Sequence, residues 1–243
     1  MERLTLRAPA SSADFDLLPM WYELAGVSSH DGKYTRSVTD FREAWEHGHL
    51  GTAIGGGFGS NLKALVSLDQ KQWPAARTAL RLLTLNGEQI GAIVLGAHDV
   101  LWNHVGKLTS MDLNAEQGAM KYIAMVLTFA KIHAAAIHPD HRKQGYGTHL
   151  LEAAKNLGAH DGLVKMYGQF NADRPGLPEF YTAAGFRVLD AGKPLNVEMA
   201  TGRAGDYMGC RPSERYFEWL NPEPPRSSTR VPPSNRRSRR RRR

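Results

Sequence analysis

The stretch that decides the fold is Ile137-His138-Pro139-Asp140-His141-Arg142-Lys143-Gln144-Gly145-Tyr146-Gly147-Thr148. An apolar run stops at the proline, two adjacent cations follow, and two glycines open an amphipathic segment. This order predicts a strand, a short turn and then a helix. The helix is predicted over residues 146–157 with a stop at Gly158, because its apolar positions recur at helical spacing: Tyr146, Leu150, Ala153, Ala154 and Leu157.

The composition of this turn suits a polyanion. The first-turn amides of a helix have no partner within the helix and point at whatever lies above them. Glycines at 145 and 147 lack the Cβ atoms that would keep a pyrophosphate from the backbone. Arg142 and Lys143 add positive charge, and the Thr148 hydroxyl can donate to a phosphate oxygen. The residues favour a phosphate-binding loop over the alternative, an ordinary glycine-containing helix start.

Outward from this turn, the clearest local signal is Asn86-Gly87, a pair that tolerates the positive φ angles of a type I′ turn. Apolar runs flank it, so a β-hairpin is predicted over residues 80–95. Residues 97–117 are predicted to form a long connection, which at this length is often functional or carries a short helix and which is long enough to cover the site, and the structure of 122–130 stays open. The remaining predicted elements are strands at 4–6, 132–137, 163–170, from 186 and at 215–219, and helices over 12–24, from 39 and over 178–184.

A second glycine-rich segment, residues 55–61, reads Gly-Gly-Gly-Phe-Gly-Ser-Asn. No Lys-Ser/Thr pair follows at the spacing of a P-loop, and the glycines do not fit the dinucleotide fingerprint. A flexible turn is therefore predicted here. The alternation of strands and helices in the second half of the chain predicts an α/β or α+β layered sheet.

Residues 142–147 resemble the Arg/Gln-x-x-Gly-x-Gly/Ala signature of the GNAT superfamily of N-acetyltransferases, and residues 137–139 look like the end of that family's fourth strand. Residues 178–186, Pro-Glu-Phe-Tyr-Thr-Ala-Ala-Gly-Phe, resemble its Phe-Tyr-x-x-x-Gly-Phe segment. The resemblance covers roughly residues 79–220 and is only coarse over 1–78. It implies a mixed, mostly antiparallel sheet with a splayed central strand and flanking helices.

The resemblance also implies acetyl-CoA, or another acyl-CoA, as the donor in a direct transfer to a primary amine. The backbone of Ala135, Ala136 and Ile137 would hold the pantetheine arm, and Tyr181 would protonate the leaving thiolate. The pyrophosphate would lie on the loop and the first helical turn, which comprise Arg142, Lys143, Gln144, Gly145, Tyr146, Gly147 and Thr148.

Two positions depart from the family pattern. Asn171, the candidate for a CoA-binding asparagine, lies further from Tyr181 than in the family, because Asp173-Arg174-Pro175-Gly176 intervenes. Lys131 stands where protein-lysine acetylating relatives carry a catalytic glutamate. His133 or a water relay is then the remaining candidate for the general base.

The net charge of +7 is unevenly distributed along the 243 residues. Residues 222–243 hold nine arginines and one glutamate, a net charge of +8, so residues 1–221 carry −1. The tail is predicted to be disordered. Its alternative role is nonspecific attachment to nucleic acid, ribosomes or acidic proteins. Residues 1–221 are expected to form one domain, with a strand and the acceptor-side helices in 1–78 and the core in 79–221.

Other sequence features bear on the cellular compartment, on disulfides and on metal binding. The single cysteine, Cys210, excludes an intrachain disulfide and a multi-cysteine zinc site. The first residues lack a secretory pattern, and the longest apolar stretch is too short for a membrane span, so a soluble cytoplasmic protein is expected. His138 and His141 have a spacing seen in metal sites, but a proline separates them and no third ligand is near, so no metal is expected.

An N-acetyltransferase is the first functional hypothesis, with a small-molecule amine slightly favoured over a protein amine as acceptor. The alternative is a non-catalytic protein that binds acyl-CoA, or that associates with nucleic acid or ribosomes through the arginine tail. A homodimer stays open, since dimers are frequent in the family.

Overall fold

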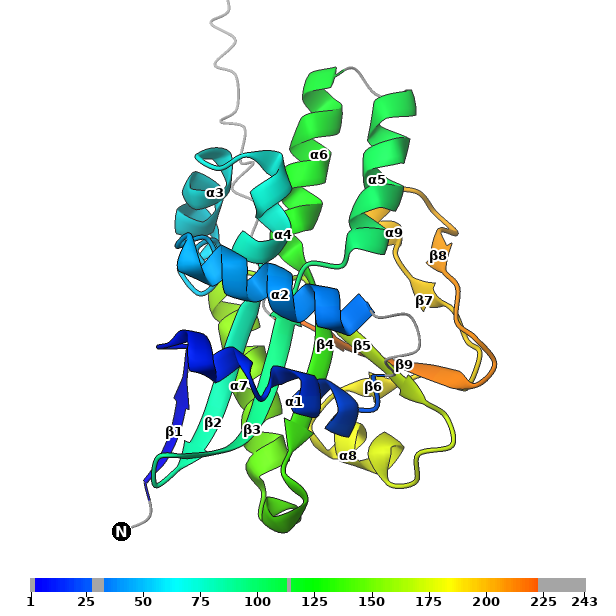
Figure 1. Cartoon of the computed structure of the whole chain (residues 1–243). Coiled ribbons are helices and arrows are strands. Elements are labelled where there is room, and N and C mark those ends of the chain that lie inside the picture. Colours follow the sequence, from blue (N-terminus) through cyan, green and yellow to red (C-terminus); the bar gives the residue numbers. More distant parts are fainter. Residues whose placement is uncertain (1–2, 28–32, 113–114, 223–243) are drawn as a thin grey trace, which may run out of the picture.

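A central seven-stranded sheet organises the computed structural model, which describes residues 3–27, 33–112 and 115–222 (Figure 1). The tail beyond residue 222, predicted to be disordered, lies outside the described residues. Neighbouring strands are antiparallel except for one parallel pair, β4 and β5, so the predicted mixed and mostly antiparallel sheet is confirmed. In spatial order the strands are β1 (Leu4–Arg7), β2 (Ala79–Leu85), β3 (Glu88–Gly96), β4 (Phe129–Ile137), β5 (Lys165–Asn171), β9 (Glu214–Leu220) and β6 (Arg187–Val188).

The hairpin between β2 and β3 turns as the sequence predicts. Asn86 and Gly87 both have positive φ, 52° and 91°, as a type I′ turn requires. The strands that it joins bury almost every side chain, which explains their continuous apolar runs.

Helices cover both faces of the sheet. Helices α1 (Leu18–Leu24) and α2 (Lys33–Glu46) lie in front of the strands in Figure 1, and α7 (Tyr146–Asp161) lies behind them. The front layer buries Trp21 and Leu18 against β2, β3 and β4. The rear layer buries Leu150 and Leu151 of α7 against the same strands. A short helix, α8 (Leu177–Ala183), packs beside β6.

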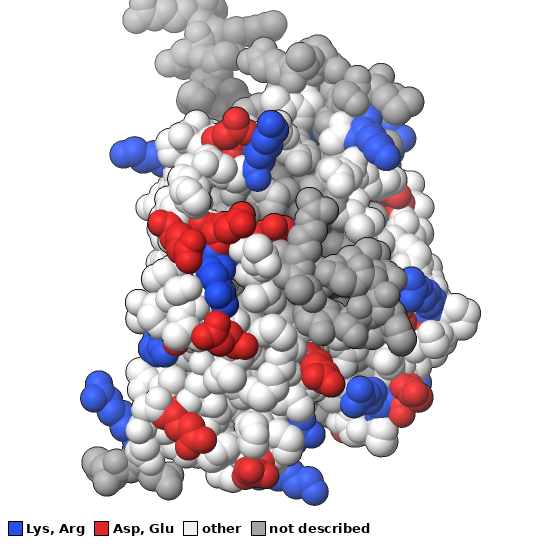
Figure 2. All heavy atoms as spheres, viewed as in Figure 1, with Lys and Arg blue, Asp and Glu red and all other residues white. Residues whose placement is uncertain are grey.

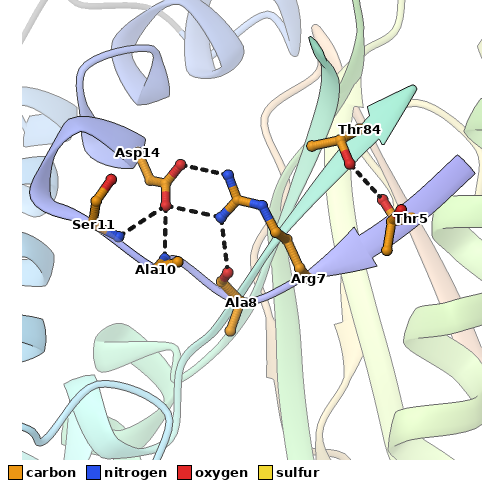
Figure 3. Close-up of polar contacts among 7 residues, drawn as sticks. All are labelled: Thr5, Arg7, Ala8, Ala10, Ser11, Asp14 and Thr84. Atoms are coloured by element: carbon orange, nitrogen blue, oxygen red, sulfur yellow. Dashed lines mark hydrogen bonds and ion pairs between the residues drawn. The ribbon is translucent and has the colours of Figure 1, made fainter. Parts of the chain in front are cut away.

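The connection from β1 to the front layer is held by a carboxylate, Asp14, in the 3-10 turn Ser12–Phe15 (Figure 3). Two guanidinium nitrogens of Arg7 donate to its two oxygens at 2.7 and 2.8 Å, and the amides of Ala10 and Ser11 donate as well. These donors, Arg7 above all, hold the pKa of Asp14 well below its usual range. The Thr84 hydroxyl of β2 donates to the Thr5 carbonyl at 3.4 Å, next to the main-chain pairing of the two strands.

The long connection predicted over residues 97–117 is wrong. Helix α5 (Asp99–Asp112) and helix α6 (Ala115–Thr128) lie side by side beyond the end of the sheet instead (Figure 1). Leu101, Trp102 and Val105 of α5 pack with Val126 and other residues of α6, so the helices stabilise each other through a tertiary contact. Helix α6 passes directly into β4 at residue 129, and no glycine or proline marks the boundary that the sequence left open over 122–130.

The helix predicted to stop at Gly158 continues to Asp161, and its C-cap is Gly162 with φ 73°. Gly158 has a packing role: a Cβ there would lie 3.0 Å from the Met166 side chain and 3.1 Å from that of Leu163. Helix and sheet approach closely at this point, which a larger residue would prevent.

The turn predicted over residues 55–61 is shorter than expected, because α3 (Phe58–Val66) begins within it. The backbone amides of residues 55–57 donate hydrogen bonds to side-chain oxygens. Gly55 N and Gly57 N donate to the two oxygens of Asp161 at 2.7 and 3.0 Å, and Gly56 N donates to Asn61 Oδ1 at 3.2 Å. Asp161 also lies 3.8 Å from the buried guanidinium of Arg77.

The remaining helices and strands of the described ranges are short. Helix α4 (Trp73–Ala76) precedes β2, helix α9 (Glu198–Thr201) packs near α5 and α6, and strands β7 (Leu195–Asn196) and β8 (Tyr207–Met208) form a separate ladder. None of the helices within the described ranges has the length and apolar character to span a bilayer. Figure 2 shows basic and acidic side chains interspersed on the viewed face, in keeping with the small net charge of residues 1–221.

Candidate active site

Two neighbouring strands of the sheet separate and open a cleft. Strand β4 pairs with β5 at only three positions, Phe129 to Lys131 against Lys165 to Tyr167. Both strands continue further without pairing with each other, to Ile137 and Asn171. The cleft has a volume of about 1580 Å³ and reaches from the 142–148 loop, past β4, β5 and α8, to the front helices α1 and α2.

The structure brings most of the predicted site residues to this one cleft. Gln144 and Tyr146 lie outside its lining, although both contribute backbone to the loop beside it. The predicted residues that line it are Tyr181, His133, Ala135, Ala136, Ile137, Arg142, Lys143, Gly145, Gly147, Thr148 and Asn171.

The 142–148 loop presents unpaired amides. Helix α7 begins at Tyr146, and the first amide with a helical acceptor is that of His149, which donates to the Gly145 carbonyl. Within the described part of the chain, the amides of residues 143–148 have no hydrogen-bond acceptor. Arg142 folds back onto the end of β4 and donates through Nε to the Ile137 carbonyl at 3.1 Å. The result is a row of donors beside two cations, which is suited to an anion of several charges.

The two glycines of the loop have different tasks. Gly145 has φ 82°, and a Cβ there would meet no atom within 4 Å, so glycine is favoured by the backbone conformation. At Gly147 a Cβ would lie 3.1 Å from the ring of Phe180, so this glycine allows α7 and α8 to pack closely. Lys143 also has positive φ, 60°, a conformation unusual for a residue with a side chain.

Tyr181 lies in an aromatic cluster at the wall of the cleft. Its ring stacks on Phe217 with a centroid distance of 3.7 Å and on Phe170 at 5.5 Å. Burial raises the pKa of Tyr181 well above its usual range, so the phenol stays protonated at neutral pH. Its hydroxyl has no hydrogen-bond partner within the described ranges, which leaves it available to a ligand in the cleft.

His133 occupies an irregularity of β4. In the pairing with β3, Val94 faces Ala134 and Leu95 faces Ile132, so His133 has no partner residue. Such a bulge redirects the side chain of the extra residue. Its Nε2 is hydrogen-bonded to the Ala97 carbonyl, which fixes the proton on Nε2 in the neutral ring. Burial, helped by the nearby Lys131 ammonium, lowers the pKa of His133 to about 3.

Among the polar side chains that line the cleft without having been predicted as site residues are Lys131, Gln169 and Glu214. Lys131 Nζ donates to Gln169 Oε1 at 3.3 Å, and burial lowers the pKa of Lys131 to about 8 although Glu214 acts in the opposite direction. No local pattern identifies Glu214. It reaches the cleft because β9 pairs with β5, which sets Glu214 opposite Asn171.

A second buried histidine lies behind this group. His98 Nδ1 is 2.8 Å from the Tyr167 hydroxyl, and its ring is 6.3 Å from that of His133. Burial, followed by the charge of Lys131, lowers the pKa of His98 to about 2. Both rings are therefore neutral at physiological pH, and each is hydrogen-bonded to an oxygen of the same chain.

The described residues contain no group of three or more His, Cys, Asp or Glu side chains that could hold a metal ion. The pair considered from the sequence, His138 and His141, has a ring separation of 6.2 Å, and His138 Nδ1 lies 3.6 Å from the Asp140 carboxylate.

The family model described as an acetyltransferase (GNAT) domain matches residues 81–188 of the chain. This range contains most of the hairpin, the splayed strand, the 142–148 loop and Tyr181. No curated protein matches the chain in sequence.

Several solved structures resemble the chain at low identity. An acetyltransferase assigned to the GNAT family from Desulfovibrio desulfuricans is 14% identical, with 90% of this chain and 99% of that one covered and a TM-score of 0.49. The ribosomal-protein-S18-alanine N-acetyltransferase from Escherichia coli is 12% identical, with 90% of this chain and 94% of that one covered and a TM-score of 0.46. A GNAT family acetyltransferase from Elizabethkingia anophelis with acetyl-CoA bound is 16% identical, with 63% and 83% covered and a TM-score of 0.38.

Proposed function

We propose that the protein transfers an acetyl group from acetyl-CoA directly to a primary amine, because its residues 81–188 match the family model of an acetyltransferase (GNAT) domain. The observation that carries this proposal is the row of unpaired amides over residues 143–148, next to Arg142 and Lys143 at one end of the cleft. A nucleotide pyrophosphate has the charge and the acceptors that such a row requires.

The splay of the sheet supports an extended ligand next to this loop. Beyond Lys131 the edge of β4 that faces β5 has no strand partner. Ala135, Ala136 and Ile137 lie on this free edge and line the cleft. Backbone N–H and C=O groups at an unpaired edge seek partners, and the amides of a pantetheine arm would supply them as an added strand does.

The chemistry of acyl transfer then assigns roles to the remaining side chains. The amine must lose a proton, the thioester oxygen needs a donor as it becomes an oxyanion, and the thiolate leaves more readily if it is protonated. The free β4 edge would supply the N–H donor. Tyr181, whose hydroxyl stays protonated, would be the acid. His133 is too weakly basic to be protonated at pH 7, and its proton lies on Nε2, so its Nδ1 would accept a hydrogen bond from a water that carries the amine proton to solvent.

A small-molecule amine is the proposed acceptor. Residues 97–117, which were expected to cover the site, belong to the α5–α6 hairpin beyond the end of the sheet. They therefore give no support to a small-molecule acceptor. Support comes from the front helices, since Tyr22 of α1 and Phe41 and His47 of α2 line the cleft opposite the sheet. They enclose a space that suits a small molecule better than a folded surface.

Calorimetry with acetyl-CoA tests the proposal. We expect micromolar binding to the whole chain, and a loss of more than about 100-fold in affinity in Gly145→Glu, because a carboxylate would face the phosphates. The control is Gly48→Glu, since Gly48 lies outside the cleft and a Cβ there would meet no atom within 4 Å. No binding at high micromolar ligand would contradict the proposal. Binding without thiol release over a panel of amines would favour the non-catalytic alternative.

Tyr181→Phe tests the assignment of the acid. The phenyl ring preserves the stacking on Phe217, so acetyl-CoA affinity should stay within about twofold. Turnover should fall by about 10²-fold or more, which is typical of a lost general acid. If turnover is unchanged, Tyr181 has no part in the proton transfer.

A further inference from the structure

The cleft contains a primary amine of its own. Lys131 is the last residue of β4 that pairs with β5, and its side chain lines the cleft just where the two strands separate. We propose that Lys131 is an internal acetyl acceptor, so that the enzyme acetylates itself at Nζ of this residue. The inference rests on the acetyl-CoA binding proposed above and adds a modification site to it.

Lys131 lies close to the proposed position of the thioester. Lys131 precedes the bulged His133 by two residues, which is roughly 6–7 Å along a strand. The free edge of β4 that would hold the pantetheine arm begins beyond this point. The flexible four-carbon stem of a lysine covers a distance of this size. The amine is thus within reach of a thioester that lies between the β4 edge and Tyr181.

The contacts made by the amine also support the proposal. Nζ of Lys131 donates to an amide oxygen, Gln169 Oε1, and no carboxylate lies within ion-pair distance of it in the described ranges. Two other enclosed lysines form ion pairs with carboxylates: Lys155 Nζ lies 2.6 Å from Glu152, and Lys165 Nζ lies 2.7 Å from Glu218. Lys131 has no such contact within the described ranges.

Burial favours the neutral form of Lys131, and most titratable groups around it carry no charge at neutral pH. Burial lowers the pKa of Lys131 to about 8, against about 10.4 for an ordinary lysine. His98 and His133 stay neutral, with pKa values lowered to about 2 and 3, and burial raises the pKa of the Tyr167 phenol well above its usual value. Glu214 is the only one of these neighbours that favours the ammonium.

The step balances without a further reagent. The lone pair of neutral Nζ attacks the thioester carbonyl, an N–C bond forms, and the C–S bond breaks. The thiolate takes a proton from the Tyr181 hydroxyl, which regains one from solvent. The second proton on nitrogen leaves through water to bulk solvent. The products are an acetamide on Lys131 and free coenzyme A thiol, and no oxidant or metal takes part.

The experiment is intact-mass spectrometry of the whole chain incubated with acetyl-CoA and no added amine, followed by peptide mapping. We expect one added acetyl group, on Lys131, formed at a rate independent of protein concentration. Lys131→Arg keeps the charge but should lower the adduct at least tenfold. Lys71→Arg is the matched control: Lys71 lines the same cleft but is exposed and lies near α4, and its replacement should change nothing.

The pH profile gives an independent readout. The rate should rise about tenfold per pH unit below pH 8, where the neutral amine is scarce, and should level off above about pH 9. A rise that continues past pH 10, or labelling spread over exposed lysines such as Lys71, would overturn the proposal, because both indicate reaction in solution.

Failure of this inference and failure of the proposed function give different results. If calorimetry shows acetyl-CoA binding and Lys131 stays unmodified, the inference is wrong and the proposed function stands. If acetyl-CoA does not bind at all, the proposed function itself is wrong.

Discussion

Two glycine-rich turns of this protein present backbone amides to an anion, and they differ in where the anion comes from. At residues 55–57 the amides donate to side-chain oxygens of the same chain, those of Asp161 and Asn61. At residues 143–148 the amides have no acceptor within the described residues. The first turn is completed by folding, whereas the second is the one proposed to bind a ligand.

The difference shows that glycine content identifies an anion-binding turn but not its anion. Asp161 is fully buried and also meets Arg77, so the first turn is part of the core. Arg142 and Lys143 line the open cleft. The same local chemistry thus stabilises the fold at one place and is proposed to bind acetyl-CoA at the other.

The largest expected effect comes from removing the internal anion. Asp161→Asn leaves the buried Arg77 without a counterion and weakens two hydrogen bonds, so it should lower the free energy of unfolding by about 3–5 kcal/mol. Chemical denaturation measures this change. Glu152→Gln is the control on the same helix, since its half-exposed pair with Lys155 is worth less than about 1 kcal/mol. If Asp161→Asn and Glu152→Gln lower the free energy of unfolding equally, Asp161 is not the internal anion that completes the first turn.

The next prediction distinguishes the two turns by which property changes, the free energy of unfolding alone or also the acetyl-CoA affinity. Gly57 has φ 78° and ψ 161°, and Gly145 has φ 82° and ψ −7°, so alanine is strained at both. Gly57→Ala and Gly145→Ala should each lower the free energy of unfolding by about 1–2 kcal/mol. Only Gly145→Ala should also lower acetyl-CoA affinity, by about tenfold, in calorimetry on folded protein. A similar loss of affinity in Gly57→Ala would contradict the comparison.

A smaller effect concerns salt. The ammonium of Lys143 lies at the open cleft, so Lys143→Gln should reduce acetyl-CoA affinity about fivefold at low ionic strength and by less at 0.5 M salt. The buried pair of Asp161 and Arg77 is shielded from ions, so the difference in unfolding free energy between wild type and Asp161→Asn should not depend on salt. A salt-dependent difference would mean that solvent reaches the first turn.

The smallest effect tests the backbone of the open turn. Lys143 has φ 60°, and glycine adopts this angle without strain. Lys143→Gly should raise the free energy of unfolding by a few tenths of a kcal/mol while acetyl-CoA affinity falls as in Lys143→Gln. Lower stability in thermal unfolding would show that the lysine side chain contributes more to the fold than its backbone conformation costs.

The sequence was informative where structure depends on neighbouring residues. Asn86-Gly87 predicted the hairpin, and residues 137–148 predicted a strand, a turn and the beginning of α7. These signals are local, because turn chemistry and helix spacing act over a few positions.

Features that depend on distant residues could not be predicted. Helices α5 and α6 stabilise each other across a tertiary contact, and the span 97–117 shows little pattern alone. Asp161 lies 104 and 106 positions from the glycines that bind it. Glu214 enters the cleft through the register of β9 on β5. Each requires knowledge of which elements become neighbours, which a single sequence does not contain.

The short ladder between β4 and β5 has a mechanical consequence. Only three residue pairs join the four strands on one side of the sheet to the three on the other, and β6 at the far edge has the one shorter ladder among the described strands of this sheet, with two pairs. An extended ligand bonded to the free β4 edge while it contacts α8 would bridge the same two halves. Occupancy of the cleft would then stiffen the molecule along this line.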